Sequence, residues 1–403
     1  MLKARNVAGE NIDTKLLQKV TNSVRIIDAP AIDIFRAWHW FKKAANRFRG
    51  HENTPPDPID SSELNEKSGE MSLKDKVTTF FKIPENAIGW LLPAISMALL
   101  KDKRPNIIYS SAPPFTGHLV GVVLKKIWRV PLICDFRDPW LGNPFRHEHE
   151  GRLGKWDQFL EKIVFKNSDL VIANTSKMKE LFVKRYPDYK EKIKVITNGF
   201  DPEDFENIKP ERTVSSKKIL MVHPGSLYGQ RNPLEFLRGL NQAIYEFGCK
   251  ELMVQFIGPC GVFDGKSIEQ HLDDLKLENY VELVQSVSHA KALSLMKGAD
   301  ILLLFSQGTQ IQVPAKLYEY FGMERPILAI CEPNSSTELI LSDVSDSVYV
   351  TMNEAELIRN VLVRTLDDFM SPIKKVYTNH ERLKSYQRHS QAQELALLMR
   401  GII

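Results

Sequence analysis

The sequence has little of what marks several classes of protein. It has only four cysteines in 403 residues, and none of them forms a CxxC pair. This spacing disfavours a structural zinc site and favours reduced thiols in a cytoplasmic protein. No apolar run reaches the ~18 residues that a membrane-spanning helix needs. The longest run, Ala87 to Leu100, contains Pro93, and it predicts a buried or interfacial helix.

Common cofactor motifs are also missing. No predicted strand is followed by GxGxxG, which argues against a nicotinamide-dependent dehydrogenase. The tripeptide Asp-x-Asp does not occur either, which argues against sugar transfer through a metal held by that motif. A near match to a P-loop at Gly261, Gly265, Lys266 and Ser267 is one residue too short, so an ordinary strand-to-helix turn is predicted there.

Charge is nearly balanced. The chain has 54 basic and 50 acidic residues, for a net charge of +4, which gives no support to nucleic-acid binding. His147, Glu148 and His149 alternate in a polar stretch with no further ligand nearby. They predict an exposed charge run, and we expect no metal site.

What is present is an alternation of short β-branched runs with longer stretches of helical periodicity, which is typical of βαβ units and parallel sheets. One set of predicted strands comprises Val24 to Asp28, Asn106 to Ser110, Pro131 to Phe136, Leu170 to Asn174 and Ile193 to Thr197. A second set follows the polar linker Pro210 to Ser216 and comprises Ile219 to His223, Leu252 to Ile257, Val281 to Val284, Ile301 to Phe305, Pro326 to Ile330 and Val348 to Thr351. The pattern predicts an α/β protein of two Rossmann-like domains, with ligands at the carboxyl ends of the strands.

Other segments add detail to this scheme. Leu237, Leu240, Ile244 and Phe247 recur at helical spacing and predict an amphipathic helix against the second sheet. The stretch 50–70 has three prolines and almost no apolar residue, and it predicts a mobile surface loop. Residues 1–15 supply neither the complete strand nor the glycine-bearing turn that opens a Rossmann-like domain, so a first βα unit is expected to be missing.

The first candidate site is the segment 312–320, which follows the predicted strand Ile301 to Phe305. Pro314 suits the first turn of a helix, and Val313 and Lys316 lie at that helix start, where free N–H groups favour a diphosphate. Glu319 is three residues further on, and a carboxylate there can accept hydrogen bonds from a ribose diol. An amphipathic helix with a surface Lys–Glu pair is the alternative.

The second candidate is the segment 223–233, which leaves the first strand of the second domain through two glycines. Gly225 would let the backbone approach a ligand closely, and Arg231 would offer a charged fork to phosphate oxygens. Ser226 and Tyr228 belong to the same predicted donor loop. A flexible surface turn is the alternative.

Polar residues of the first domain form the third candidate. Asp138 follows a buried strand, and His118 follows the neighbouring strand. We predict that His118 acts on an acceptor hydroxyl and that Asp138 orients it or binds sugar hydroxyls. A solvent-facing histidine at a helix start is the alternative for His118.

The segment 34–49 combines an aromatic and aliphatic helical stripe with five basic side chains. Such a helix is typical of a peripheral contact with an anionic membrane. A helix packed on the first domain, with a solvated basic face, is equally compatible with the pattern.

Taken together, six ordered motifs resemble those of the GT-B glycosyltransferases of family 4, in the branch that builds bacterial surface polysaccharides. The motifs are IIYSSAPPFTGHLVG, PLICDFRDPW, SDLVIANTS, KVITNGFDPEDF, HPGSLYGQRNP and VPAKLYEYFGMERPILA. The resemblance implies two facing Rossmann-like domains, with an acceptor-side domain at 1–200, a linker at 201–216 and a nucleotide-sugar domain at 217–375. It also implies that a helix within 376–403 packs back on the first domain.

The resemblance further implies a retaining transfer from a UDP- or GDP-sugar to a glycan or polyprenyl-linked acceptor, with no cofactor and no required metal. It favours phosphate binding by Arg231 and Lys316 and ribose binding by Glu319. Two departures stand out, since Ile311 occupies the place of a donor-sugar glutamate of many members and the opening strand and glycine-rich loop are missing. A nucleotide-sugar 2-epimerase and a truncated, inactive binding protein therefore stay open as alternatives.

Overall fold

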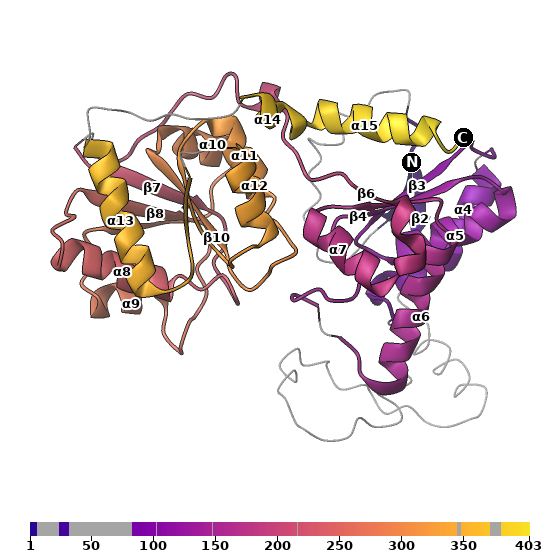
Figure 1. The fold of residues 1–403 in the computed structure, drawn as a ribbon, viewed down its shortest axis with the longest axis horizontal. Coiled ribbons are helices and arrows are strands. Elements are labelled where there is room, and N and C mark those ends of the chain that lie inside the picture. The colour runs from indigo at the N-terminus through magenta and orange to yellow at the C-terminus, as the bar shows by residue number, and fades with distance from the viewer. Residues whose placement is uncertain are drawn as a thin grey trace, which may run out of the picture. The chain divides into compact units, whose positions relative to one another are not determined.

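The structure is a computed structural model that describes residues 1–5, 24–31, 83–101, 103–146, 148–215, 217–344, 348–370 and 380–403. The chain divides into two compact units, whose elements are labelled in Figure 1. Unit 1 comprises Met1–Ile172, Asp188–Lys192 and Ile402–Ile403, and unit 2 comprises Ala173–Pro187 and Ile193–Gly401. The predicted loop at 50–70 and the predicted basic helix at 34–49 lie outside the described residues.

Two parallel sheets form the N-terminal half of the fold. A two-stranded sheet pairs β1 (Leu2–Arg5) with β2 (Ile27–Pro30). A four-stranded sheet has the order β3-β4-β5-β6, with β3 at Ile108–Ala112, β4 at Leu132–Phe136, β5 at Leu170–Ala173 and β6 at Ile193–Val195. Every residue of β4 and β5 is buried, which explains their continuous apolar runs. The strands predicted here are confirmed to within a few residues.

The helices of this half are α4 (Leu91–Lys101), α5 (Thr116–Trp128), α6 (Gly151–Asn167) and α7 (Ser176–Arg185), with 3-10 turns at Asn86–Trp90, Pro187–Lys192 and Pro202–Asp204. The predicted helix at 87–100 is confirmed as the first 3-10 turn followed by α4. Ala94 and Ala98 are buried in a small core with Trp90, and Leu100 on the opposite side is exposed. The helix therefore buries only one of its faces.

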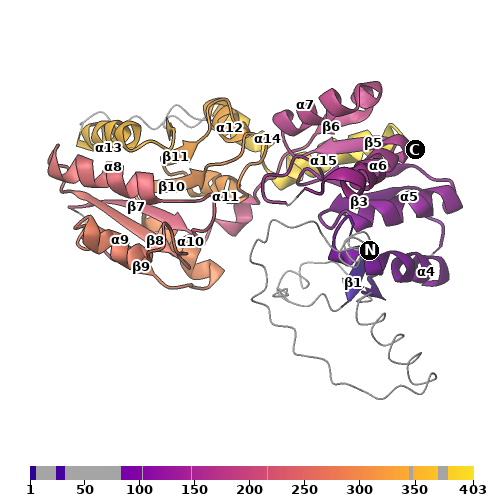
Figure 2. The same cartoon turned by 90° about the horizontal axis from the view of Figure 1, so that it is seen from below.

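Unit 2 contains a six-stranded parallel sheet in the order β12-β11-β10-β7-β8-β9. Its strands are β7 (Ile219–Pro224), β8 (Leu252–Ile257), β9 (Val281–Val284), β10 (Ile301–Ser306), β11 (Ile327–Cys331) and β12 (Val348–Thr351). Alternate residues of β7 enter two separate apolar cores, one on each face of the sheet. Figure 2 shows helices on both faces of this sheet. All six strands predicted for the second set are confirmed.

One face of that sheet is covered by α8 (Leu234–Tyr245), α9 (Ile268–Asp274) and α13 (Ala355–Met370), and the other by α10 (His289–Gly298), α11 (Lys316–Met323) and α12 (Ser336–Val344). Leu237, Leu240 and Ile244 of α8 are fully buried, as predicted. Phe247 was wrongly assigned to this stripe, because it lies beyond the helix end and is 53% exposed. The chain turns there through Gly248 at φ +74°, and the Cys249 N–H donates to the Ala243 carbonyl.

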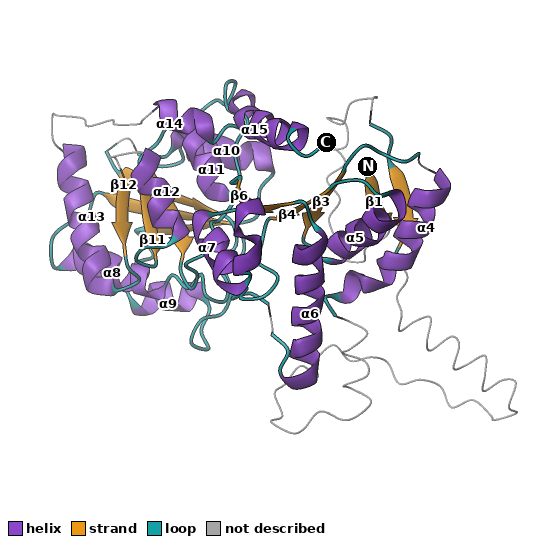
Figure 3. Ribbon diagram, turned by 45° about the vertical axis from the view of Figure 1, so that its right-hand side comes forward, coloured by secondary structure: helices purple, strands orange, loops and turns teal. Residues whose placement is uncertain are grey.

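The C-terminal segment forms α14 (His380–Ser385) and α15 (Arg388–Arg400), so the predicted terminal helix is confirmed but interrupted. The Arg388 N–H donates to the Phe200 carbonyl at 3.0 Å, which ties the start of α15 to the residue just before the predicted linker. Both helices are labelled in Figure 3. None of the helices described is long and apolar enough to cross a membrane. The predicted packing of this segment on the first domain stays a prediction.

Candidate functional site

The carboxyl edge of the unit 2 sheet brings two loops together. The loop after β7 and the loop after β10 leave from neighbouring strands at the same edge. The Gln307 side-chain amide, just past β10, donates to the carbonyl of Asn232 in the other loop at 3.0 Å. A Cβ at Gly308 would overlap the amide oxygen of Gln230. The two segments predicted to bind a donor are therefore packed against each other.

Gly225, the first residue after β7, lies where the loop after β7 meets the start of α11. Its backbone has φ +117°, a conformation that only glycine adopts readily, and its N–H donates to the Ile257 carbonyl at 2.6 Å. A Cβ at this position would overlap the Nζ of Lys316. The missing side chain therefore leaves room for the Lys316 ammonium directly over the backbone of the β7 loop.

Lys316 is the first residue of α11, at the positive end of that helix. Burial, and after it the charge of the Arg231 guanidinium, lower the pKa of Lys316 to about 8, against an opposing effect of Glu319. Within the described part of the chain, no carboxylate forms an ion pair with Lys316 or Arg231, and the Arg231 guanidinium lies 5.7 Å from the centre of the Tyr228 ring. Two cations thus face one region with no carboxylate in direct contact with either among the described residues, an electrostatic arrangement that suits a bound phosphate.

His223 in β7 is a buried residue beside these cations. Its Nδ1 donates to the Leu303 carbonyl at 2.8 Å, which fixes the neutral tautomer with Nε2 as an acceptor. No group among the described residues donates to Nε2. Burial, together with the charges of Lys316 and Arg231, lowers the pKa of His223 to about 3. His223 was not among the predicted site residues, although its position at the end of a predicted strand was a usable signal.

The remaining predicted donor residues lie around this centre. The Glu319 side chain is 39% exposed, and its carboxylate is 3.5 Å from the His289 ring. Val313 is buried in the apolar core beneath α11, Ser226 is half-buried, and Tyr228 is exposed at the loop tip. The structure thus brings Gly225, Arg231 and Lys316 together and places Glu319 one helical turn further on.

In unit 1, His118 lies in the first turn of α5 and is completely buried. Its Nδ1 is 2.9 Å from the Ser110 hydroxyl, and its ring packs on Phe136 at 4.4 Å. Burial lowers the pKa of His118 to about 3, so the ring is neutral. The histidine is therefore not solvent-facing and contacts only protein atoms. Asp138 is half-buried in the turn after β4.

A polar cluster near Asp138 was not predicted. Asp135 of β4 is buried and accepts hydrogen bonds from the Tyr109 hydroxyl, the Ser111 hydroxyl at 3.2 Å and the Arg137 guanidinium at 3.1 Å. Burial and the adjacent carboxylate raise the pKa of Tyr109, which therefore stays a neutral donor. Ser111 lies opposite Asp135 in the strand register, and this pairing was invisible before the sheet order was known.

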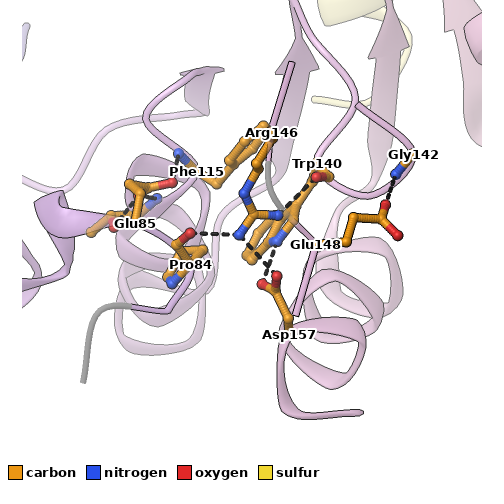
Figure 4. A network of polar contacts seen from close by, with 9 residues as sticks. Pro84, Glu85, Phe115, Trp140, Gly142, Arg146, Glu148 and Asp157 are labelled. Carbon is orange, nitrogen blue, oxygen red and sulfur yellow. Dashed lines mark hydrogen bonds and ion pairs between the residues drawn. The ribbon is translucent and has the colours of Figure 1, made fainter. Parts of the chain in front are cut away.

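At the start of α5 the free backbone N–H groups donate to a carboxylate from an earlier part of the chain. Figure 4 shows Glu85 accepting from the Phe115 N–H at 3.0 Å, and it accepts from the Thr116 N–H at 2.7 Å as well. Burial raises the pKa of Glu85, and these hydrogen bonds act in the opposite direction. In the same view Arg146 bridges the Pro84 carbonyl and Asp157 of α6. This network fixes the α5 start to the loop after β4.

Other predicted features are ordinary structure. Lys266 of the short P-loop-like turn pairs with Asp274 at 2.6 Å, and Ser267 forms a capping box at the start of α9. The prediction of a plain turn is thus confirmed. Glu148 accepts from the Gly142 N–H, and His147 lies outside the described residues. Among the residues described, no cluster of metal-ligating side chains occurs.

Comparisons with known proteins show which family and which solved structures the chain is similar to. The family model for Glycosyltransferase Family 4 matches residues 56–204. This stretch of the chain is thus similar to the glycosyltransferases of family 4. No curated protein matches the sequence. The predicted membership is confirmed at this level, whereas the surface-polysaccharide branch and the missing first unit stay predictions.

Solved structures show the same fold at low sequence identity. Anabaena Alr3699/HepE in complex with UDP has a TM-score of 0.58 and 16% identity, covering 78% of this chain and 84% of that one. A glycosyltransferase from Rickettsia africae has a TM-score of 0.58 and 12% identity, covering 96% and 91%. A trehalose-phosphate synthase from Burkholderia xenovorans, solved with glucose-6-phosphate, has a TM-score of 0.55 and 12% identity, covering 82% and 79%. The predicted GT-B fold class is thereby confirmed.

Proposed function

We propose that this family 4 protein is a retaining glycosyltransferase that moves a sugar from a UDP-sugar to a glycan or lipid-linked acceptor in cell-surface polysaccharide synthesis. The observation that carries the proposal is the pair of cations, Lys316 and Arg231, facing the glycine loop after β7 with no internal carboxylate partner in the described chain. The structural neighbour HepE, solved with UDP and with UDP-glucose, supports UDP over GDP as the nucleotide.

Each side chain then has a role set by its place. The diphosphate lies between Gly225 and the start of α11, where Lys316 and Arg231 stabilise the negative charge that develops on the leaving group. Glu319, one turn along α11, accepts hydrogen bonds from the ribose hydroxyls. The Nε2 atom of His223, buried beside the two cations and without a donor among the described residues, is an acceptor for a hydroxyl group of the bound donor. Protein cations replace a metal in this scheme.

The acceptor side is assigned to unit 1. Asp138, half-buried after β4, binds hydroxyl groups of the sugar or of the acceptor. His118 is buried and neutral, so we propose that it positions the turn after β3 through Ser110 rather than taking a proton from the acceptor. The Tyr109 hydroxyl donates its proton to Asp135, so its oxygen is a further hydrogen-bond acceptor on this side.

The test measures the thermal unfolding temperature of the full chain with and without UDP or GDP. We expect the unfolding temperature to rise by several degrees with UDP in excess, because a ligand that binds only the folded chain shifts the unfolding equilibrium. Gly225→Ala should abolish the shift, since its Cβ would displace the Lys316 ammonium. Gly229→Ala is the matched control, because Gly229 also has positive φ but its Cβ would meet nothing within 4 Å.

Turnover separates the remaining alternatives. A transferase releases UDP from UDP-glucose and yields a glycoside or, without acceptor, free glucose. A 2-epimerase would change the sugar at C2, and a binding protein would give stabilisation without any product. UDP stabilisation that survives in Gly225→Ala would contradict the proposed position of the diphosphate.

A further inference from the structure

The helix α6 in unit 1 has an unusual division of charge. Its two acidic residues, Asp157 and Glu161, are both buried. Asp157 accepts from the Trp140 indole at 2.7 Å and pairs with Arg146 at 2.8 Å, so it belongs to the interior network of Figure 4. The four cations of the helix are instead exposed, and they are Arg152, Lys155, Lys162 and Lys166. Among the residues that the structure describes, none of these four forms an ion pair.

An apolar stripe runs along the same outer face. Trp156, Phe159 and Ile163 follow one another at spacings of three and four, so they share one side of the helix. Phe159 is 50% exposed, and its ring stacks on that of Trp156 at 5.5 Å with an interplanar angle of 28°. Figure 3 shows α6 along its length. The outer face therefore combines stacked aromatic rings with four cations and carries no acid.

This combination fits a lipid surface better than water or a folded protein partner. Indole and phenyl rings are stable in the headgroup layer of a bilayer, where one side of the ring is apolar and the other is wet. Lysine and arginine beside them attract anionic headgroups, and the exposed carboxylate nearest to them along the helix is Glu150, the N-cap that precedes its first residue. The chain has a net charge of only +4, so such attraction has to be local.

We propose that α6 docks the protein on an anionic lipid surface, with Trp156 and Phe159 in the headgroup layer and the four cations against the lipid phosphates. The proposal does not depend on the nature of the sugar transfer. It also differs from the surface predicted at 34–49, which lies outside the described residues.

The test is co-sedimentation of the full chain with vesicles of phosphatidylcholine containing 30% phosphatidylglycerol. We expect binding to these vesicles and at least ~10-fold weaker binding to pure phosphatidylcholine, since each basic residue near an anionic surface adds to the affinity. Lys155→Glu/Lys162→Glu and Trp156→Ser/Phe159→Ser should each weaken binding at least ~10-fold. Lys250→Glu/Lys384→Glu makes the same charge change at exposed lysines of unit 2 and should bind like the wild type. Circular dichroism would verify that every variant is folded.

Several outcomes would overturn the proposal. They are failure of the wild type to bind, equal binding to both vesicle types, and binding by the α6 variants that matches the control. Loss of binding on reversing Arg36, Lys42 and Arg47 alone, with the α6 variants unaffected, would assign the membrane contact to the other segment. Preference for duplex DNA over the anionic vesicles would identify a nucleic-acid surface instead and would equally overturn the proposal.

Discussion

The starts of α5 in unit 1 and α11 in unit 2 are equivalent places in the two units, because each helix follows a strand of a parallel sheet. At α5 the free N–H groups are taken by the Glu85 carboxylate, which comes from a segment 30 residues earlier. At α11 the same position has the Lys316 ammonium, a second cation at Arg231 and no carboxylate partner in the described chain. One helix start is satisfied by the protein itself, and the other is complementary to an external anion.

The difference shows how one architecture is used in two ways. A helix start favours negative charge whatever its origin. Where the chain supplies the charge, as Glu85 does, the result is a fixed structural joint, and no phosphate has room to bind. Where the chain supplies only cations, burial of an unpaired ammonium costs stability, and the pKa of Lys316 falls to about 8. In the proposed function, binding of the diphosphate offsets that cost.

The largest effect is expected for removal of the cation at α11. Lys316→Ala should weaken UDP binding about 100-fold, because a charge-assisted contact to a phosphate in a partly buried site is worth about 2–3 kcal/mol. Isothermal titration calorimetry of the full chain measures the dissociation constant for UDP. Lys266→Ala is the matched control, since Lys266 is exposed and paired with Asp274. Equal loss in both variants would point to a general charge effect rather than to this site.

The corresponding change in unit 1 should affect stability and not nucleotide binding. Glu85→Ala leaves the N–H groups of Phe115 and Thr116 unpaired in a part-buried place, and it should lower the free energy of unfolding by about 2 kcal/mol. Urea denaturation measures this value. Glu148→Ala, which removes an exposed carboxylate from the same region, should cost less than about 1 kcal/mol. A large change in UDP affinity on Glu85→Ala would contradict the purely structural role assigned to the start of α5.

The pH dependence of UDP binding tests whether the Lys316 ammonium at the start of α11 holds the nucleotide. Lys316 has a pKa of about 8 in the free protein, so its ammonium is lost as the pH rises through that value. The phosphates of UDP are already ionised above pH ~7, so the dissociation constant should rise about tenfold between pH 7.5 and pH 9. Because the unfolded chain keeps this proton up to the ordinary pKa of 10.5, Lys316 makes the free energy of unfolding increase with pH between about 8 and 10.5.

Lys316→Arg is the control for the pH experiment. A guanidinium stays protonated throughout this range, so the affinity of the variant for UDP should be nearly constant. An unchanged pH profile would show that a group other than Lys316 controls binding.

The smallest effect is expected at a third helix start, that of α9. Ser267 caps this helix with its own hydroxyl, as part of a capping box with Gln270. Ser267→Ala should lower the free energy of unfolding by about 1 kcal/mol and leave UDP affinity unchanged. Denaturant unfolding and titration calorimetry measure the two quantities. A clear loss of UDP binding would mean that the short glycine turn at 261–267 holds phosphate after all.

Much of the fold follows from local sequence patterns. The strands of unit 2 are continuous apolar runs because both of their faces are buried, and each was predicted within a residue or two. The helix α8 was equally clear from Leu237, Leu240 and Ile244. The end of that helix was missed at Phe247, because a left-handed turn at Gly248 ends the helix where the apolar spacing alone would continue it.

The site was predictable only in part. Gly225, Arg231 and Lys316 were found because a glycine turn and a helix start each have a local signature. Their mutual approach depends on β7 and β10 being neighbours, which no local pattern shows. Glu85 and Asp135 were missed for the same reason, since their partners lie about 20 to 30 residues away in the chain. His118 was predicted to act on an acceptor hydroxyl, with a solvent-facing position as the alternative, and its burial against Phe136 depends on the packing of α5 on the sheet.

The most direct test of this account is a crystal structure of the full chain with UDP bound. We predict that the diphosphate contacts the Lys316 ammonium and the Arg231 guanidinium beside Gly225, with the ribose hydroxyls on Glu319. A diphosphate bound at the start of α5 or α9, or bound without contact to Lys316, would contradict the account.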